Sequence, residues 1–179
     1  MSIDHIKARI PEYAKDLRLN FGSVLTTQGA PGLSQDQIWG VALASALASR
    51  NESFAADLGE LLTEYADVSV IRAAKTAAAV MGMNNIYYRF VHLSGDETYA
   101  GMPARLRMNA IASPGVPKID FELFSIAVSA VNGCGKCIEA HEKALRREGV
   151  SPESIHSAVR IAAVIHAIAA TGLENAEAA

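Results

Sequence analysis

Apolar residues recur at helical spacing along almost the whole of this 179-residue chain, and this periodicity leaves few fold classes open to it. The segment from Trp39 to Leu47 is an example, and no window shows the persistent alternation of apolar and polar residues that is typical of a half-buried strand. Residues typical of helix ends separate the periodic segments. Ser34 and Gln37 have the spacing of a capping box, and Gly133 follows a periodic segment as a helix-terminating glycine. The sequence therefore predicts an all-α protein.

Caps and breaks divide the chain into helices joined by short loops. Ser69, Asp120 and Ser151 are the expected caps of three helices, and Pro103 suits the first position of another. The expected helices cover residues 2–24 with a break near Pro11, then 34–51, 54–65, 70–90, 103–113, 120–132, 135–148 and 151–172. We expect a loop over residues 94–101 and a frayed tail after Gly172.

A chain of this length can bury a substantial core, and we expect a single domain over residues 1–179. Half of the residues are hydrophobic but only 6% are aromatic, so the core should be mainly aliphatic. The formal net charge of −3, with acidic and basic residues interspersed, argues against nucleic acid as a partner. Neither a secretory signal nor an apolar stretch of membrane-spanning length is visible, so we expect a cytoplasmic location without membrane association.

The two halves of the chain resemble each other at an offset of about 85 residues, which aligns residues 37–43 with residues 122–128. Chance similarity between two alanine-rich amphipathic segments is the alternative explanation. The matching order of the helices and the nearly constant offset favour a degenerate repeat of about residues 34–90 and 120–172 within the single domain.

The two cysteines of the chain, Cys134 and Cys137, form a CxxC motif directly after Gly133. In the repeat, Ser49 and Glu52 occupy their positions, so we expect redox chemistry in the second half alone. Unpaired backbone N–H groups and the positive dipole end of a helix start favour a thiolate at Cys134. Lys136 adds a cation that would also stabilise a thiolate.

A histidine and a glutamate complete the reactive groups around this motif. His141 follows Cys137 by four residues, so their Cβ atoms should lie about 5–6 Å apart on one helix face. His141 is then placed to take the proton of Cys137, and Glu122 on the preceding helix is placed to orient His141. A nucleophile, a base and an orienting group together are typical of an activated-nucleophile site.

Three other interpretations of these residues remain open. The CxxC motif and His141 could bind zinc, but structural zinc sites usually have four ligands, so we expect no metal. Both cysteines could be inert core residues, although a helix start is an unusual place for them. Glu122 could be an acid that simply stabilises the first turn of its helix.

Motifs along nearly the whole chain match those of a known family. They are Pro11-Glu12-Tyr13-Ala14-Lys15-Asp16, Met81-Gly82-Met83-Asn84-Asn85, Arg105-Leu106-Arg107-Met108-Asn109, Pro114-Gly115, Phe121-Glu122-Leu123, Ala127-Val128-Ser129-Ala130, Asn132-Gly133-Cys134, Cys137 and Ala140-His141-Glu142. The chain resembles the AhpD family of alkylhydroperoxidases, whose glutamate, CxxC and histidine pattern distinguishes it within the carboxymuconolactone decarboxylase-like superfamily. The resemblance implies the AhpD-like fold, which is all-α with a duplicated helical unit.

The resemblance implies an antioxidant thiol peroxidase that reduces alkyl hydroperoxides. In that role Cys137 becomes the sulfenic acid, Cys134 is the proton donor and resolving thiol, the two form the redox disulfide, and Glu122 with His141 forms the proton relay. Well-known members carry histidine where this chain has Lys136, so any role of that histidine does not transfer. From its place at the helix start, we also expect Cys134 to exchange with the disulfides of lipoyl groups and partners.

The resemblance further implies partners and a reductant. A dihydrolipoyl group on a 2-oxoacid dehydrogenase component would reduce the disulfide as an external reductant, with no bound cofactor. Electrons would also pass to the peroxiredoxin AhpC, and the protein would assemble as a homotrimer. Two further functions stay open, namely a redox adaptor that exchanges disulfides without reducing peroxide, and a decarboxylase-like enzyme for a small molecule that does not need the thiols. The intact CxxC motif argues against the latter.

Overall fold

The computed structural model describes residues 1–173, and all regular elements in that range are helical. The helices are α1 (Ile3–Ala8), α2 (Asp16–Val24), α3 (Gln35–Ala48), α4 (Glu52–Leu62), α5 (Val68–Leu93), α6 (Glu97–Ala100), α7 (Asn109–Ala112), α8 (Lys118–Val131), α9 (Gly135–Arg147) and α10 (Pro152–Ala170), with a short 3-10 helix, η1 (Glu12–Ala14), between α1 and α2. The all-α prediction is confirmed. Residues 174–179, which include most of the tail expected to fray, lie outside the described part of the chain.

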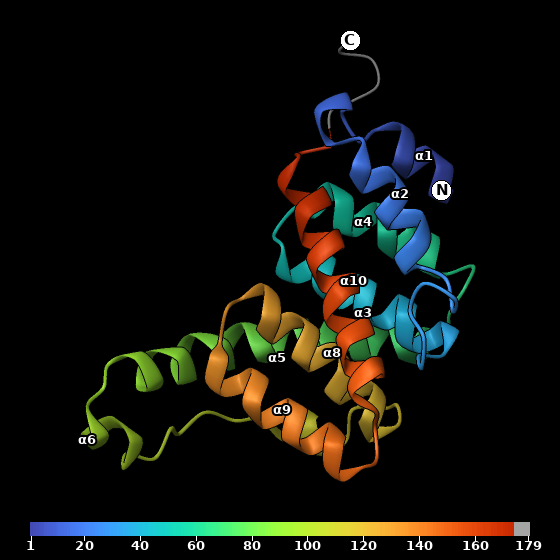
Figure 1. Cartoon of the computed structure of the whole chain (residues 1–179). Coiled ribbons are helices and arrows are strands. Elements are labelled where there is room, and N and C mark those ends of the chain that lie inside the picture. Colours follow the sequence, from blue (N-terminus) through green and yellow to red (C-terminus); the bar gives the residue numbers. More distant parts are fainter. Residues whose placement is uncertain (174–179) are drawn as a thin grey trace.

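Helices α3 and α8 form the centre of the molecule, where they pack against each other and against α5 and α10 (Figure 1). Every residue from 38 to 46 in α3 and from 121 to 129 in α8 is buried, as expected for helices surrounded by others. The two helices approach closely at Gly40, because a Cβ atom there would lie 2.2 Å from Cζ of Phe124. A side chain larger than hydrogen at residue 40 is therefore incompatible with this packing.

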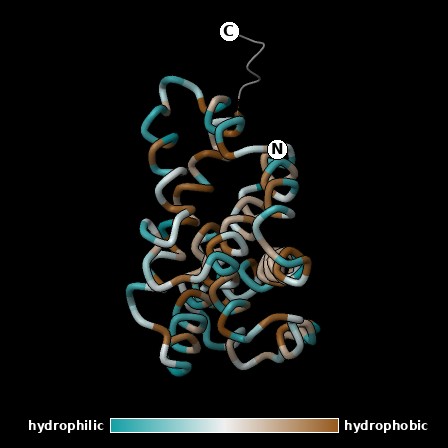
Figure 2. Tube along the Cα trace, turned by 90° about the vertical axis from the view of Figure 1, so that its right-hand side faces the viewer, coloured by the Kyte–Doolittle hydropathy of each residue, from teal (hydrophilic) through white to brown (hydrophobic). Residues whose placement is uncertain are grey.

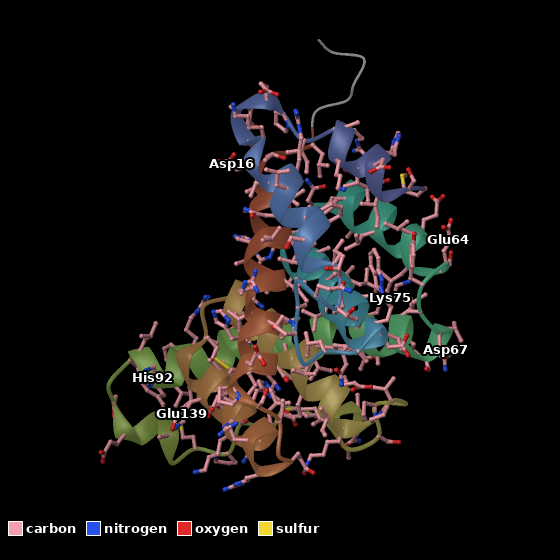
Figure 3. The ribbon with its side chains drawn as sticks, turned by 45° about the vertical axis from the view of Figure 1, so that its right-hand side comes forward. Asp16, Glu64, Asp67, Lys75, His92 and Glu139 are labelled. Carbon is pink, nitrogen blue, oxygen red and sulfur yellow. A yellow bond between two sulfur atoms is a disulfide. The ribbon has the colours of Figure 1, made fainter. Side chains whose placement is uncertain are left out.

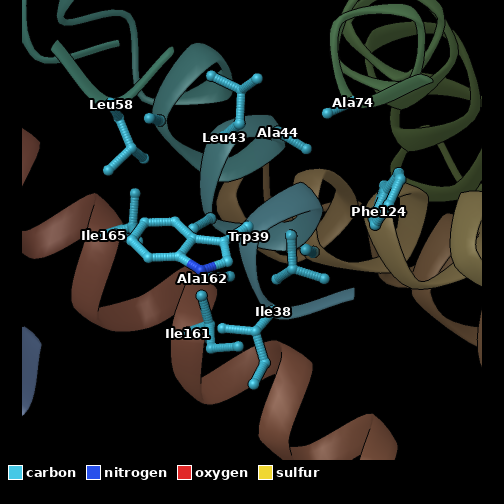
Figure 4. Packing of buried hydrophobic residues seen from close by; sticks show 14 of the residues in the cluster. Ile38, Trp39, Leu43, Ala44, Leu58, Ala74, Phe124, Ile161, Ala162 and Ile165 are labelled. Carbon is cyan, nitrogen blue, oxygen red and sulfur yellow. The ribbon is translucent and has the colours of Figure 1, made fainter. Parts of the chain in front are cut away.

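The core is mainly aliphatic, as predicted, with a few large aromatic rings among alanine, leucine, isoleucine and valine. Figure 4 shows the indole of Trp39 surrounded by Leu58 of α4 and by Ile161 and Ile165 of α10. The tube in Figure 2 changes between apolar and polar residues along the helices, which is the pattern of helices with one buried face. Burial of these faces holds the helices together.

Charged side chains of both signs are spread over the outside of the molecule. Figure 3 labels six exposed examples, namely Asp16, Glu64, Asp67, Lys75, His92 and Glu139. Within residues 1–173, no helix combines the length and the hydropathy needed to cross a membrane.

The strongest predicted helix starts are confirmed by their hydrogen bonds. Ser34 and Gln37 form a complete capping box, in which Ser34 N donates to Gln37 Oε1 at 2.9 Å and Gln37 N donates to Ser34 Oγ at 3.2 Å. Ser151 caps α10, since its Oγ accepts a hydrogen bond from Ser154 N at 3.1 Å. Side chains that satisfy free N–H groups therefore set these boundaries.

Two predicted caps are wrong. Helix α5 begins two residues earlier than expected, because Asp67 rather than Ser69 accepts the capping hydrogen bond. Helix α8 begins at Lys118, which places Asp120 in its first turn instead of at its cap. Asp120 Oδ1 accepts a hydrogen bond from Gln37 Nε2 at 2.7 Å, so its carboxylate joins α8 to α3.

The predictions for residues 94–113 are also wrong. The expected loop contains α6, which begins where Asp96 Oδ1 accepts a hydrogen bond from Thr98 N at 2.9 Å. The helix expected over residues 103–113 is reduced to α7, and Arg105 has a φ of 53°, which a continuous helix cannot accommodate. None of the residues in α6 or α7 is buried, so tertiary packing does not extend these helices.

Helix ends define a precise correspondence between the two halves of the chain. Helices α3 and α8 both have 14 residues, and their bounds differ by 83 positions at each end. Each is followed by a residue with positive φ, 61° at Arg50 and 67° at Gly133, and then by an extended cap, Asn51 or Cys134. That the halves arose by duplication stays a prediction.

The predicted offset of about 85 residues is therefore wrong by two positions. Asn51 and Phe54, rather than Ser49 and Glu52, occupy the places of Cys134 and Cys137. Two alanine-rich helices can be aligned in several registers with similar sequence agreement. The backbone turn that follows each helix can be superimposed in only one register, so the turn defines the offset.

Candidate active site

The turn between α8 and α9 presents the CxxC motif. Gly133, with φ of 67°, ends α8, and Cys134 N donates a hydrogen bond to Ser129 O at 3.0 Å. Cys134 is the cap of α9, and its Sγ accepts a hydrogen bond from Cys137 N at 3.3 Å. Sulfur thus occupies the place where caps usually carry oxygen, at the positive end of the helix dipole.

Cys134 and Cys137 are joined by a disulfide bond. Cys134 is fully buried, whereas Cys137 is 6% exposed and lines a cavity. Only the second sulfur is therefore open to a molecule in that cavity.

The predicted imidazole and carboxylate lie together beside the disulfide. His141 Nδ1 is 2.7 Å from Glu122 Oε2, and both side chains are largely buried. Because a carboxylate only accepts hydrogen bonds, Nδ1 carries the hydrogen and donates it to Glu122. Glu122 is in the second turn of α8, so the first-turn interpretation does not describe its position.

A methionine that the sequence analysis names only within a matched motif completes this group. Met81 Sδ lies 3.2 Å from His141 Nε2. Met81 comes from α5, and its separation of 60 residues from His141 left no sequence signal for the contact. The carboxylate thus orients the imidazole at Nδ1, and the thioether of Met81 lies beside Nε2.

These residues line a cavity of about 240 Å³ between α5 and α9. Its lining residues are Met81, Asn84, Tyr88, Lys136, Cys137, Ala140 and His141. A neighbouring cavity of about 400 Å³ shares Tyr88 and Lys136 and extends towards α6. The first cavity is largely apolar, so it suits a molecule with an alkyl or aryl part and a small polar group.

Lys136 lies at the wall shared by the two cavities. Its Nζ is 3.5 Å from Glu139 Oε2, and more than half of its side chain is exposed. The predicted influence of Lys136 on a thiolate stays a prediction, because this ammonium group also faces an acidic neighbour and water.

A polar network fixes the end of α8 just before the motif. Asn85 Nδ2 donates to Ser129 Oγ at 2.9 Å, and Asn132 Nδ2 donates to Asn85 Oδ1 at 2.9 Å. Arg89 donates to Asn132 O at 2.5 Å. Two residues of α5 thereby hold the backbone from which the CxxC turn departs.

The corresponding positions in the first half contain no reactive group. Trp39, Phe54 and Leu58 stand 83 positions before Glu122, Cys137 and His141, and all three are buried in the core. Figure 4 shows Trp39 and Leu58 beside Ile165. The same arrangement of helices therefore holds packing side chains in one half and reactive side chains in the other.

Zinc binding is the other use that the CxxC motif and His141 allow. Among residues 1–173, no group of three or more histidine, cysteine, aspartate or glutamate side chains is arranged to hold a metal ion.

Comparison with known proteins finds close relatives over nearly the whole chain. Residues 97–177 match the model of the carboxymuconolactone decarboxylase family. The alkyl hydroperoxide reductase AhpD of Rhodospirillum centenum is 57% identical over 169 residues, which are 94% of this chain and 89% of that protein. The proteins of the same name are 53% identical in Bradyrhizobium sp., over 94% of this chain and 92% of theirs, and 51% identical in Brucella canis, over 99% of both.

Proposed function

Because this chain belongs to the AhpD family, we propose that it is an alkyl hydroperoxide reductase with an antioxidant role that acts through Cys134 and Cys137. The observation that carries the proposal is the shared cavity, in which Cys137 and His141 face the same largely apolar space. An alkyl hydroperoxide has the matching chemistry, since it joins an apolar tail to a small polar O–O–H group. A dithiol at the same place supplies the two electrons that reduction of the O–O bond requires.

In the proposed reaction, the Cys137 thiolate attacks the terminal oxygen of the hydroperoxide. The S–O bond forms as the O–O bond breaks, so the sulfur loses two electrons and the peroxide leaves as an alkoxide that takes a proton to become the alcohol. Cys134 then attacks the Cys137 sulfenic acid, the S–S bond forms, and hydroxide leaves as water after taking the proton of the Cys134 thiol. The disulfide is the oxidised product of this cycle.

His141 and Glu122 are the proposed proton relay. Glu122 holds the hydrogen on Nδ1 at 2.7 Å, which leaves Nε2 as the nitrogen that takes the proton of Cys137 and returns it to the leaving alkoxide. The negative charge of Glu122 stabilises the imidazolium that forms between these two steps.

A dihydrolipoyl group is the proposed reductant, supplied by a 2-oxoacid dehydrogenase component, with the peroxiredoxin AhpC as a further electron acceptor. We propose that Cys137 carries out the exchange step that was expected of Cys134. The Cys137 sulfur lines the cavity, whereas Cys134 is fully buried. Cys134 is then the leaving thiolate, which the hydrogen bond from Cys137 N and the helix dipole stabilise.

A homotrimer is the proposed assembly, and the projecting end of α5 with α6 is the surface that supports it (Figure 1). Large apolar side chains are exposed there, namely Ile86, Phe90, Leu93, Tyr99 and Met102. Such a concentration of apolar surface is typical of protein interfaces. Light scattering of the purified protein tests the assembly, and a monomeric mass would contradict it.

A reducing compartment such as the cytoplasm suits a dithiol that must be regenerated.

The proposed function is tested by following hydroperoxide consumption with dihydrolipoamide, thioredoxin or glutathione as the reductant. We expect turnover with dihydrolipoamide and none in Cys137→Ser. Rapid disulfide exchange without peroxide-dependent turnover would identify a redox adaptor instead, and lactone turnover that survives loss of both cysteines would identify a decarboxylase-like enzyme.

A further inference from the structure

Asn84 is a buried polar residue whose side chain the fold does not satisfy. It lies on α5, is 5% exposed, and its Oδ1 is sealed from solvent without a hydrogen-bond partner among residues 1–173. Leaving a buried polar atom unpaired lowers stability, and native proteins contain few such atoms. The presence of such a residue at this position therefore calls for an explanation other than its contribution to stability.

The neighbouring residue shows what a structural asparagine on this helix looks like. Asn85 is fully buried, and its carboxamide donates to Ser129 and accepts from Asn132. Helix α5 therefore pairs both polar atoms of a carboxamide where it serves the fold, whereas Oδ1 of Asn84 has no partner.

The position of Asn84 indicates a role in the reaction. It lines the same cavity as Cys137 and His141. Three other residues in the described part of the chain carry a sealed and unpaired polar atom, namely Arg9, Trp39 and Ser125, and none of them lines this cavity. Since Oδ1 is sealed, the amide Nδ2 is the polar end of Asn84 that a molecule in the cavity can meet.

We infer that the Asn84 amide binds the hydroperoxide by donating a hydrogen bond to the oxygen that bears the alkyl group. This inference rests on the proposed function and adds a substrate-binding residue to it. As the Cys137 thiolate bonds to the terminal oxygen and the O–O bond breaks, negative charge collects on the alkyl-bearing oxygen before it takes its proton. A fixed amide donor stabilises that charge in the transition state more than in the bound substrate.

The test separates the two half-reactions of the full-length protein. The reduced protein is mixed with cumene hydroperoxide and its remaining thiols are counted by alkylation and mass spectrometry, and the oxidised protein is mixed with dihydrolipoamide and followed in the same way. We expect Asn84→Leu and Asn84→Asp to slow peroxide oxidation on the order of 10²-fold, as loss of a transition-state donor does. Reduction by dihydrolipoamide should stay within about twofold of the wild type, because no donor to an alkoxide takes part in thiol exchange.

Thermal unfolding provides the control for a merely structural role. Asn84→Leu removes an unpaired buried atom, so its melting temperature should equal or exceed that of the wild type. Ser125→Ala removes another unpaired atom outside the cavity and should leave both half-reactions unchanged. The inference is overturned if both Asn84 variants react with peroxide at the wild-type rate, or if both half-reactions slow equally. A wild-type protein that does not react with peroxide would overturn the proposed function itself, and the inference with it.

Discussion

The imidazole of His141 and the carboxylate of Glu122 form a largely buried pair, with 2.7 Å between Nδ1 and Oε2. The pair joins α8 to α9 across the CxxC turn, so the two helices position it together. The carboxylate fixes the hydrogen on Nδ1 and leaves Nε2 beside Met81 and the cavity. Orientation of a base by a buried carboxylate is the arrangement that enzymes use to control which nitrogen reacts.

Glu122→Gln should slow oxidation of the reduced protein by cumene hydroperoxide about 10- to 100-fold. Glutamine can still accept a hydrogen bond from Nδ1, but it lacks the charge that stabilises the imidazolium. Rapid mixing followed by thiol counting measures this rate. Glu148→Gln changes an exposed acid at the end of α9 that pairs with Lys118 outside the cavity, so it should leave the rate unchanged. An equal effect of both variants would contradict the role of Glu122.

The two cysteines should differ when each is replaced by serine. In Cys134→Ser, one equivalent of peroxide should leave a stable sulfenic acid on Cys137, because no second thiol condenses with it. Mass spectrometry after trapping with a sulfenic-acid reagent locates the product. In Cys137→Ser, the buried Cys134 should remain a thiol. A sulfenic acid on Cys134 in that variant would reverse the assignment.

Asn85→Ala should lower the free energy of unfolding by about 2–4 kcal/mol, since it leaves buried partners at Ser129 and Asn132 without their hydrogen bonds. Urea denaturation measures the change. Asn84→Leu on the same helix is the matched variant, and it should not be destabilised. Equal stability of Asn85→Ala and the wild type would show that the network does not hold the end of α8.

Gly40→Ala and Gly82→Ala should have opposite effects on stability. A Cβ at residue 40 would lie 2.2 Å from Phe124 Cζ, so the substitution should cost at least about 1–3 kcal/mol through overpacking. A Cβ at residue 82 meets nothing within 4 Å, so alanine should stabilise α5 by about 0.5–1 kcal/mol. Thermal or urea unfolding of both variants measures these effects. A stabilised Gly40→Ala would contradict the close approach of α3 and α8.

Ionisation of Asp120 should make the free energy of unfolding depend on pH in the acidic range. Burial, together with the nearby Asp36, raises the pKa of Asp120 above its ordinary value of 3.8, although the hydrogen bond from Gln37 opposes this. The folded state therefore binds the proton more tightly than the unfolded state, and stability is lost as the pH rises from 3.8 through the folded pKa. Asp120→Asn keeps an acceptor for Gln37 but removes the charge.

The free energy of unfolding of Asp120→Asn and the wild type should be compared by urea denaturation between about pH 3.5 and 7. The advantage of Asp120→Asn should grow as the pH rises through this range and then level off. A difference that does not change with pH, or that shrinks as the pH rises, would contradict the raised pKa.

The boundaries of several helices followed from local chemistry, because a side chain that satisfies a free N–H group acts on residues close to it in sequence. Ser34 with Gln37 and Ser151 are examples. Helix α6 was not predicted and α7 was predicted too long, since four residues without a buried face show no periodicity. The offset between the two halves was also predicted incorrectly. The residue with positive φ in the first half is Arg50, so the sequence shows no glycine there to align with Gly133.

The all-α class, and the CxxC motif at a helix start with His141 one turn later, followed from the amino-acid sequence alone, because hydrophobic period, caps and i to i+4 spacing all act within one helix. Helix packing, in contrast, brings Glu122 to His141, buries Cys134 while Cys137 faces a cavity, and adds Met81 and Asn84 of α5 to the site. These relationships depend on how separate helices pack, and packing is set by the whole core rather than by any one segment.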